Sequence, residues 1–314
     1  MRHKIITFIG VLLFISSIIG PLVHASANVD EDARSQAGID SSIVAAQAAR
    51  QQTTTPSAAV SKNQQADVRY VAMGDSVAAG AGLPALADAS ARDELCDRSP
   101  QAYPYVIAQR LQTSVAHTAC SGAKVDEGIY GDQIRSGVRI PDQMTTAFAG
   151  GIPEIMTITI GANDVRWTQF IRQCYVTRCG LAVDNARMKV YRADLRVELA
   201  RMLTQINVNS QGSPPKVYIG GYYSPLASTE CVESDRITAP EAEWVSLQTA
   251  NLNQAIRSVT PLFDFAEFVP VDFTGHELCS ADPWVQGLDA EAPIHPTTAG
   301  QSAIAESFLT TIKQ

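Results

Sequence analysis

The sequence predicts an α/β domain of three layers (α/β/α), in which helices cover both faces of a mainly parallel central sheet. Short, almost continuously apolar runs alternate along the chain with longer amphipathic segments. Runs without polar alternation are typical of strands that are buried on both faces, as in parallel sheets. The alternation of such strands with helices is the pattern of an α/β architecture.

Four apolar runs predict the strands. They lie at residues 68–73, 155–160, 217–221 and 268–271 and are rich in β-branched and aromatic residues. These residue types favour a pleated, buried backbone.

Three further segments predict helices. Between the second and third strands, apolar residues at spacings of three or four mark one side of a long helix: Met188, Tyr191, Leu195, Leu199, Met202 and Ile206. Residues 251–263 predict a second helix, whose end Pro261 disturbs. We expect the last helix to begin where Thr298 and Gln301 stand in capping-box spacing.

Residues 1–27 are expected to form a signal peptide. Basic Arg2 and Lys4 precede a long apolar run, and small residues at Ala25 and Ala27 suit signal-peptidase cleavage. The run also reaches the lower length of a membrane span, so a retained N-terminal anchor is the alternative. On either interpretation we expect the protein to be exported.

The next segment, residues 28–66, is rich in Ala, Gln, Ser and Thr and contains no aromatic residue. Such a segment buries too little apolar surface to offset the entropy lost on ordering, which predicts a disordered linker. Residues 67–314 are long enough for one domain with a sizeable core.

The charge balance argues against nucleic acid or an anionic membrane as the main partner. The net charge is −8 and becomes −10 when Arg2 and Lys4 leave with the signal peptide. Nucleic-acid binding requires a concentrated positive surface, and the domain has no cluster of Lys and Arg. We expect no stable membrane partner after cleavage.

All six cysteines lie in the predicted domain. An even number in an exported chain favours three disulfides, although the count alone allows fifteen connectivities. A zinc site is the competing interpretation. Because there is no C-x-x-C pair, and no histidine at ligand spacing from a cysteine pair, we expect no metal.

Polar clusters follow two of the predicted strands. Residues 74–76 (GDS) end the first strand and residues 161–164 (GAND) end the second. Ligands of parallel α/β sheets bind beyond the carboxyl ends of the strands. Ser76 is therefore a candidate nucleophile, although Gly, Asp and Ser are also common turn residues.

A nucleophilic serine requires a base, which is normally a histidine. After the signal peptide the chain contains only His117, His276 and His295. His117 and His276 lie near cysteines in the sequence and favour structural or rim roles. His295 precedes Pro296, which restricts its backbone to extended conformations, and comes just before the last predicted helix. It is the candidate general base.

The oxyanion of an ester-cleaving reaction needs N–H donors that are fixed before the reaction. The N–H of Ser76 begins the helix after the first strand, where the helix dipole favours negative charge. Gly122 can approach closely because it lacks a side chain, and Asn163 carries an amide at the end of its strand. Taken singly, Gly122 can make a turn and Asn163 can cap a helix, but with Ser76 and His295 they favour a catalytic set.

These four blocks, from GDS at 74–76 to HP at 295–296, resemble those of the SGNH (GDSL-type) hydrolase family and span nearly the whole domain. The resemblance implies a flavodoxin-like α/β/α fold and no cofactor. It also implies that Ser76 is the nucleophile and His295 the general base. The oxyanion hole would then consist of Ser76, Gly122 and Asn163.

The motifs ACSGA and GHELCS, together with the six cysteines, are similar to the secreted, disulfide-bearing esterases and lipases typified by Streptomyces enzymes. That subgroup pairs its cysteines sequentially. The resemblance therefore implies three disulfides, Cys96–Cys120, Cys174–Cys179 and Cys231–Cys279.

One position departs from the family pattern. The family usually carries an aspartate three residues before the histidine, where Ala292 stands here. Some members of the subgroup use a backbone carbonyl instead, so we expect the Ala292 carbonyl to orient His295 in a Ser–His dyad. Asp289 and Glu291 are the alternatives. An uncharged acceptor stabilises a protonated histidine less than a carboxylate does.

The expected function is a secreted serine hydrolase that cleaves carboxylic esters through an acyl-serine intermediate, acting as a monomer on a small-molecule, lipid or glycan ester. Carbohydrate O-acetyl esterases and phospholipases use the same four residues and are alternatives. A catalytically silent glycan-binding module is disfavoured because all four blocks are present. A dinucleotide-binding oxidoreductase is rejected, since Pro84 falls within the formal glycine pattern at residues 80–85.

Overall fold

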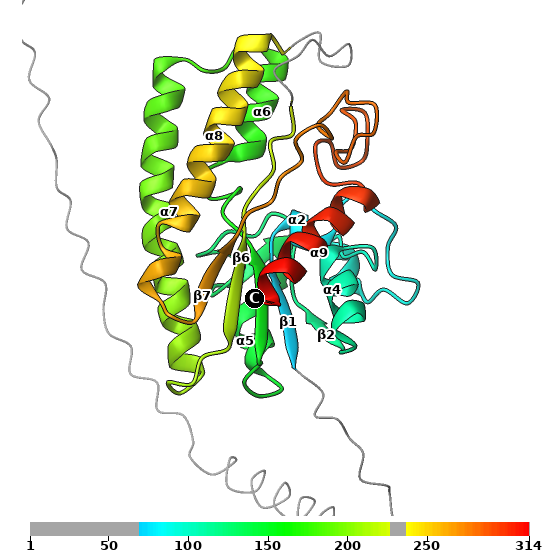
Figure 1. Ribbon diagram of the computed structural model, residues 1–314, viewed down its shortest axis with the longest axis vertical. Helices are drawn as coiled ribbons and strands as arrows, with labels where there is room; N and C mark the ends of the chain where they lie inside the picture. Colours follow the sequence, from blue (N-terminus) through cyan, green and yellow to red (C-terminus); the bar gives the residue numbers. More distant parts are fainter. Residues whose placement is uncertain (1–68, 227–236, 314) are drawn as a thin grey trace, which may run out of the picture. The chain divides into compact units, whose positions relative to one another are not determined.

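The computed structural model describes residues 69–226 and 237–313 (Figure 1). The predicted signal peptide (1–27) and linker (28–66) lie outside the described residues. In chain order the elements are β1 (Tyr70–Gly74), α2 (Ser76–Ala79), α3 (Ala91–Leu95), α4 (Tyr103–Leu111), β2 (Val115–His117), β3 (Gln133–Arg135), β4 (Val138–Ile140), α5 (Gln143–Phe148), β5 (Ile155–Thr159), α6 (Trp167–Val176), α7 (Ala182–Asn209), β6 (Lys216–Gly220), α8 (Ala239–Arg257), the 3₁₀ turn η2 (Thr260–Leu262), β7 (Ala266–Val269) and α9 (Thr298–Ile312).

A five-stranded sheet forms the centre of the domain. Its strand order is β2-β1-β5-β6-β7, and every neighbouring pair is parallel. The four strands predicted from the sequence are β1, β5, β6 and β7, so the parallel sheet is confirmed. β3 and β4 form a separate antiparallel hairpin that the sequence did not indicate.

Helices cover both faces of this sheet (Figure 1). On one side α4 and α9 pack together through stacked rings of Tyr103 and Phe308, whose centroids are 4.9 Å apart. The Tyr103 hydroxyl also meets the Thr159 hydroxyl of β5 at 3.0 Å. The other side carries α7 and α8, which contact each other along their lengths. The predicted three-layer architecture is confirmed.

The long helix α7 follows the predicted apolar side. Five of its six predicted apolar residues are almost fully buried, whereas Tyr191 is only partly buried beneath the Arg166 guanidinium. The helix predicted at 251–263 is wrong in its bounds, since α8 runs from Ala239 to Arg257 and Pro261 lies in η2. A Thr238–Glu241 capping box starts α8, a signal that apolar spacing does not contain.

The expected capping box of the last helix is also wrong. Thr297, not Thr298, is the N-cap of α9, and its hydroxyl accepts the Gly300 N–H. Gln301 instead points into the core, where its amide accepts the Tyr103 N–H at 2.8 Å and donates to the Val77 carbonyl at 2.9 Å. The side chain therefore docks α9 onto the segment after β1.

The register of β1 and β5 places the two predicted polar clusters side by side. Gly74 is opposite Thr159, the last residue of β5, and the Asp75 N–H donates to the Thr159 carbonyl. The chain segments 75–76 and 161–164 thus both lie beyond the carboxyl ends of β1 and β5.

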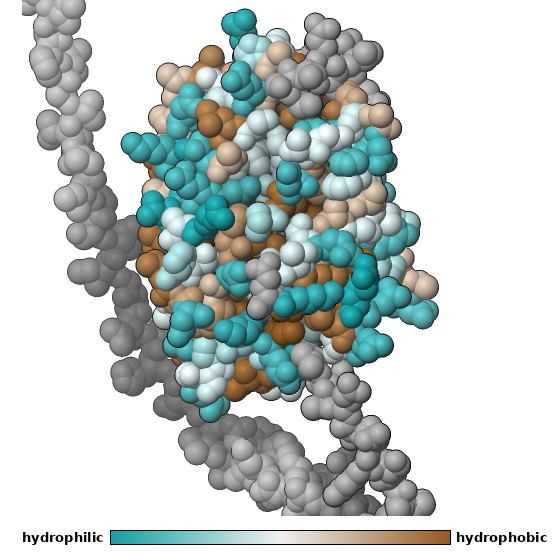
Figure 2. All heavy atoms as spheres, in the orientation of Figure 1, coloured by the Kyte–Doolittle hydropathy of each residue, from teal (hydrophilic) through white to brown (hydrophobic). Residues whose placement is uncertain are grey.

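The surface in Figure 2 mixes hydrophilic and hydrophobic residues across the face shown. Within residues 69–226 and 237–313, no helix is both long and apolar enough to cross a membrane.

Candidate active site

The turn after β1 exposes Ser76. A Cβ atom on Gly74 would lie 2.3 Å from the Thr159 carbonyl oxygen, and the φ angle of +143° is one that side-chain-bearing residues rarely adopt, so this position requires glycine. Helix α2 begins at Ser76, and the Asp75 carboxylate caps it by accepting the Val77 N–H at 3.0 Å. The strand, the glycine and the cap together fix the direction of the serine.

Asp75 is fully buried beside this serine. Its Oδ2 accepts a hydrogen bond from the Tyr222 hydroxyl at 2.5 Å. Burial raises the pKa of the Asp75 carboxyl from 3.8 to about 7, although the bonds from Tyr222 and Val77 act in the opposite direction. The hydrogen bonds from Val77 and Tyr222 fix the Asp75 carboxyl, which thereby supports the turn that carries Ser76.

His295 lies against Ser76. Its Nε2 is 2.7 Å from the Ser76 Oγ, although the two residues are 219 positions apart in the sequence. Burial lowers the pKa of the imidazole below its ordinary 6.5, whereas backbone hydrogen bonds to Pro293 and Ala292 act in the opposite direction. A neutral imidazole at this distance can accept the serine proton.

The other ring nitrogen meets a different carbonyl from the one expected. Nδ1 of His295 is 3.1 Å from the Pro293 oxygen, whereas the Ala292 carbonyl accepts the main-chain N–H of His295 at 3.2 Å. Both carbonyls raise the pKa of His295, so the Ala292 acceptor stays a prediction and Pro293 is a second candidate. In the described part of the chain, neither Asp289 nor Glu291 has a hydrogen bond to the ring.

Gly122 and Asn163 border the same space as Ser76. Gly122 has a φ angle of +79°, which strains any other residue, and its N–H has no acceptor among the described residues. One N–H of the Asn163 amide donates to the Ala123 carbonyl at 2.9 Å. Because a carboxamide has two N–H donors, the second remains available for a ligand.

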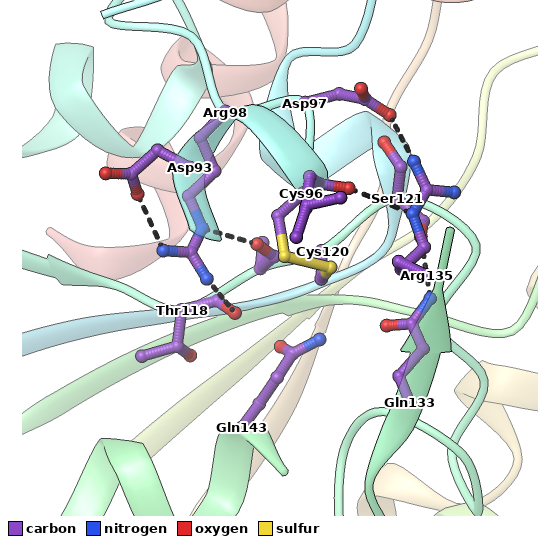
Figure 3. The surroundings of a disulfide bond; sticks show 12 residues. Asp93, Cys96, Asp97, Arg98, Thr118, Cys120, Ser121, Gln133, Arg135 and Gln143 are labelled. Carbon is purple, nitrogen blue, oxygen red and sulfur yellow. Dashed lines mark hydrogen bonds and ion pairs between the residues drawn. A yellow bond between two sulfur atoms is a disulfide. The ribbon is translucent and has the colours of Figure 1, made fainter. Parts of the chain in front are cut away.

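The segment that ends at Gly122 is held from both sides (Figure 3). Arg98 donates to the carbonyls of Ala119 and Thr118, and the Cys96–Cys120 disulfide joins the segment to the end of α3. On the opposite side of the disulfide, the Gln133 amide donates to the Ser121 carbonyl at 2.7 Å.

Arg135 lies next to this segment as well (Figure 3). It donates to the Leu95 carbonyl at 2.9 Å and pairs with Asp97 at 2.8 Å. The hairpin β3–β4 supplies both Gln133 and Arg135, so its position in the fold gives it a supporting role that no sequence motif indicated.

Two of the three predicted disulfides are present. Cys96 pairs with Cys120, and Cys174 pairs with Cys179. Cys279 is disulfide-bonded, but its predicted partner Cys231 lies outside the described residues, so the third pairing stays a prediction.

A cavity of about 450 Å³ opens at these residues, a size typical of small-molecule sites. Ser76, Gly122, Asn163 and His295 all line it. The remaining walls combine apolar residues with two hydroxyl groups and three exposed charged side chains: Ala81, Ile171, Tyr175, Leu288, Ala292, Pro293 and Ile294, with Ser121 and Thr168, and with Asp97, Arg172 and Glu291. The arrangement can hold an ester carbonyl against a serine with an apolar group beside it.

A larger groove of about 980 Å³ lies between α5, α7 and the η2 region. It is lined by Asp142, Arg196 and Arg201 among others but by no histidine, so it lacks a base for serine chemistry. No group of three or more His, Cys, Asp or Glu in residues 69–226 and 237–313 is arranged to hold a metal ion.

The other two histidines in the described part of the chain, His117 and His276, do not line the cavity. Burial lowers the pKa of His117 to about 3, and its Nε2 bonds the Ala78 carbonyl at 2.9 Å. His276 stacks on Trp284 with 3.6 Å between ring centroids. Both positions fit structural roles.

Sequence reasoning missed several residues that support the site. Tyr222, Gln133 and Arg135 hold the segments around Ser76 and Gly122, and none belongs to a motif. Tyr222 follows the end of β6, so its position at a strand end is the one signal that could have indicated it.

Known proteins resemble this chain in sequence. The model of the GDSL-like lipase/acylhydrolase family matches residues 72–303. A lipase from Streptomyces rimosus is 31% identical over 254 residues, which cover 78% of this chain and 87% of the relative. Lipase 1 from Streptomyces coelicolor is 28% identical and covers 74% of this chain and 82% of the relative.

Solved structures share the fold. The extracellular lipase of Streptomyces rimosus has a TM-score of 0.61 at 26% identity, covering 78% of this chain and 98% of that one. Phospholipase A1 from Streptomyces albidoflavus has a TM-score of 0.57 at 24% identity, covering 79% and 99%. The family match spans most of the predicted domain, and the chain belongs to the GDSL-like lipase/acylhydrolase family of ester hydrolases.

Proposed function

We propose that this protein is a secreted serine esterase or lipase in which Ser76 is the nucleophile and His295 the general base. The contact of 2.7 Å between the Ser76 Oγ and the His295 Nε2 is the observation that carries the proposal. A serine and a base within hydrogen-bond reach are the basis of nucleophilic catalysis.

In the first half of the reaction the Ser76 Oγ attacks the carbonyl carbon of the ester while its proton passes to the His295 Nε2. The carbonyl oxygen becomes an oxyanion and accepts hydrogen bonds from the N–H groups of Ser76 and Gly122 and from the Asn163 amide. The bond between the carbonyl carbon and the alcohol oxygen then breaks, and His295 gives the proton to that oxygen. The alcohol departs, and the acyl group stays bound to the Ser76 Oγ.

In the second half a water molecule attacks the acyl carbon. His295 accepts one proton of the water, the bond to the Ser76 Oγ breaks, and the proton returns to Ser76 as the carboxylic acid is released. Removing a single oxyanion donor typically lowers kcat by about 10² to 10³ in such mechanisms.

The backbone carbonyl of Pro293 takes the orienting role in this dyad. It accepts the Nδ1–H of His295 and thereby selects the tautomer in which Nε2 is the free base. A carbonyl carries a partial charge only, so it stabilises the imidazolium less than a carboxylate would.

The walls of the cavity support an apolar acyl group as the substrate part nearest to Ser76. Ile171, Tyr175 and Leu288 line the cavity beside the serine. The Streptomyces relatives described above are lipases. Burial of apolar acyl surface there contributes favourably by about 25 cal/mol per Å².

Export is part of the proposal. The basic start, long apolar run and small residues of segment 1–27 are typical of a signal peptide. The disulfides Cys96–Cys120 and Cys174–Cys179 support an oxidising compartment.

The test is Ser76→Ala, assayed with nitrophenyl esters of increasing chain length and with a fluorophosphonate label. We expect the variant to lose turnover and labelling, while wild type is labelled on the peptide that contains Ser76. Ser302→Ala serves as the control, because Ser302 is an exposed serine on α9 outside the cavity. Labelling that persists in Ser76→Ala contradicts the assignment, and an unlabelled wild type would instead favour a silent binding module.

A further inference from the structure

The loop that carries His295 determines where the imidazole sits. The ring acceptor, Pro293, belongs to the same loop, so it fixes the ring relative to the loop but not relative to Ser76. Without a carboxylate from another element, the distance between base and nucleophile depends on how this backbone is held against the serine segment.

The backbone beside His295 is itself in an unfavourable conformation. Ile294 has a φ angle of +62°, in the left-handed region that β-branched residues rarely occupy. Such a conformation persists only where surrounding contacts enforce it. The Tyr223 hydroxyl, which is buried, donates to the Ile294 carbonyl at 2.8 Å and is one of these contacts.

Gln286 makes three further hydrogen bonds to the loop that carries His295. Its main-chain N–H donates to the His295 carbonyl at 2.7 Å, and its carbonyl accepts the Ile294 N–H at 3.0 Å. The side-chain Nε2 donates to the Pro296 carbonyl at 3.0 Å. Gln286 therefore contacts three consecutive residues of the loop, and it is 8% exposed.

The same side chain also reaches the serine segment. Nε2 of Gln286 donates to the Ala81 carbonyl at 2.9 Å, and the Ala81 N–H donates to the Ser76 carbonyl at 3.0 Å. One carboxamide thus joins the segment that follows Ser76 to the residue that follows His295.

We propose that Gln286 is a positioning residue that sets the distance between Ser76 and His295. This inference rests on the proposed function of those two residues. In a conventional triad a carboxylate bonded to the imidazole aligns the ring with the serine. Here the two N–H groups of the Gln286 carboxamide would align the two backbone segments that carry Ser76 and His295. A displacement of about 1 Å at a reacting group can lower the rate by about 10².

The experiment compares Gln286→Leu and Gln286→Glu with wild type. Leucine removes the bridging amide, whereas glutamate keeps its shape but offers no N–H donor to the two carbonyls. We expect kcat and the rate constant of fluorophosphonate labelling to fall by about 10-fold to 100-fold, with KM changed by less than about twofold.

Gln248→Leu is the matched control. Gln248 is a buried glutamine of α8 that accepts from Arg192 at 2.6 Å, and it lies outside the cavity. Its loss should lower the melting temperature about as much as the loss of Gln286, but it should leave kcat unchanged. This contrast separates positioning from a general loss of stability.

Two outcomes distinguish the failures. If Ser76→Ala is still labelled, the proposed function and this inference fail together. If wild type is labelled at Ser76 and the folded Gln286 variants are labelled at the wild-type rate, or if Gln248→Leu lowers kcat equally, only the inference on Gln286 is overturned.

Discussion

At the level of single residues, the imidazole of His295 is the group whose protonation should control turnover. Only its neutral form can accept the serine proton, and burial lowers its pKa below 6.5. We therefore expect kcat/KM for a nitrophenyl ester to fall toward acid pH with a midpoint below 6.5.

The measurement is a pH–rate profile, with aliquots held at acid pH and assayed at neutral pH to show that the loss is reversible. A midpoint above 6.5 would contradict this expectation. It would indicate that a negative charge stabilises the imidazolium, as Asp289 or Glu291 would in a conventional triad.

Asp75 leads to a prediction on stability. Its pKa is raised from 3.8 to about 7 by burial, so the folded protein binds this proton more tightly than the unfolded chain does. The contribution of Asp75 to the free energy of unfolding is therefore fully present below about pH 4 and is lost as the pH rises through about 7.

Asp75→Asn removes this titration while keeping the size of the side chain. We expect the stability of wild type relative to the variant to decrease between about pH 4 and about pH 7 and to level off above that, as measured by urea unfolding at each pH. A difference that stays constant with pH would mean that the carboxyl does not titrate in this range.

The sequence indicated the candidate catalytic residues, but not the residues that hold them in place. Each of Ser76 and His295 is ambiguous alone, but with Gly122 and Asn163 they form four blocks in order along one predicted domain, and these blocks resemble a known family. Pro293 was missed because every residue has a carbonyl, so no residue type marks the one that lies at the ring. Gln286 and Tyr222 were missed for a similar reason, since each acts through a contact between segments distant in sequence.

At the level of elements, α9 is fixed to the rest of the domain by Gln301. Its amide satisfies the Tyr103 N–H of α4 and the Val77 carbonyl of α2, both of which are buried. Leaving a buried donor or acceptor unpaired costs about 1–3 kcal/mol.

We accordingly expect Gln301→Leu to lower the free energy of unfolding by about 2–5 kcal/mol, since two backbone groups lose their partner. Chemical denaturation is the measurement, and Ser302→Ala, on the exposed side of the same helix, should change stability by less than about 0.5 kcal/mol. Equal effects of the two substitutions would contradict this role of Gln301.

The elements also show where periodicity is informative. The apolar spacing in α7 spans several turns and predicted the helix correctly, whereas α8 begins twelve residues before the predicted start, at a capping box that apolar spacing does not contain. The hairpin β3–β4 has three-residue strands with exposed positions, and such short segments carry no usable pattern.

For the whole molecule, the two described disulfides close loops of very different length. The sequence separation is 24 residues for Cys96–Cys120 and 5 for Cys174–Cys179. Chain-entropy arguments assign about 3.5 kcal/mol to the longer loop and about 2 kcal/mol to the shorter one.

We expect the double variant Cys96→Ala, Cys120→Ala to lose more stability than Cys174→Ala, Cys179→Ala in urea unfolding. The first pair should also lose kcat, because its disulfide holds the segment that ends at Gly122. A larger loss of stability on removing the short loop would contradict the entropic argument.

The architecture as a whole could be predicted from the sequence because four of the five parallel strands follow apolar runs. Only β2, whose three residues are half-buried or exposed, lacks such a pattern. The cavity could not be predicted, since its walls come from α6 and the loops around Ala81 and Leu288. These segments lie far apart in the sequence, and no spacing in the sequence indicates that their side chains line one cavity.

The distance of 219 residues between Ser76 and His295 has a consequence for synthesis. Ribosomes complete the serine early and the histidine only shortly before the final helix. On the proposed mechanism, Ser76 of an unfinished chain therefore lacks its base. Ester hydrolysis becomes possible only once the completed polypeptide has folded and His295 lies against Ser76.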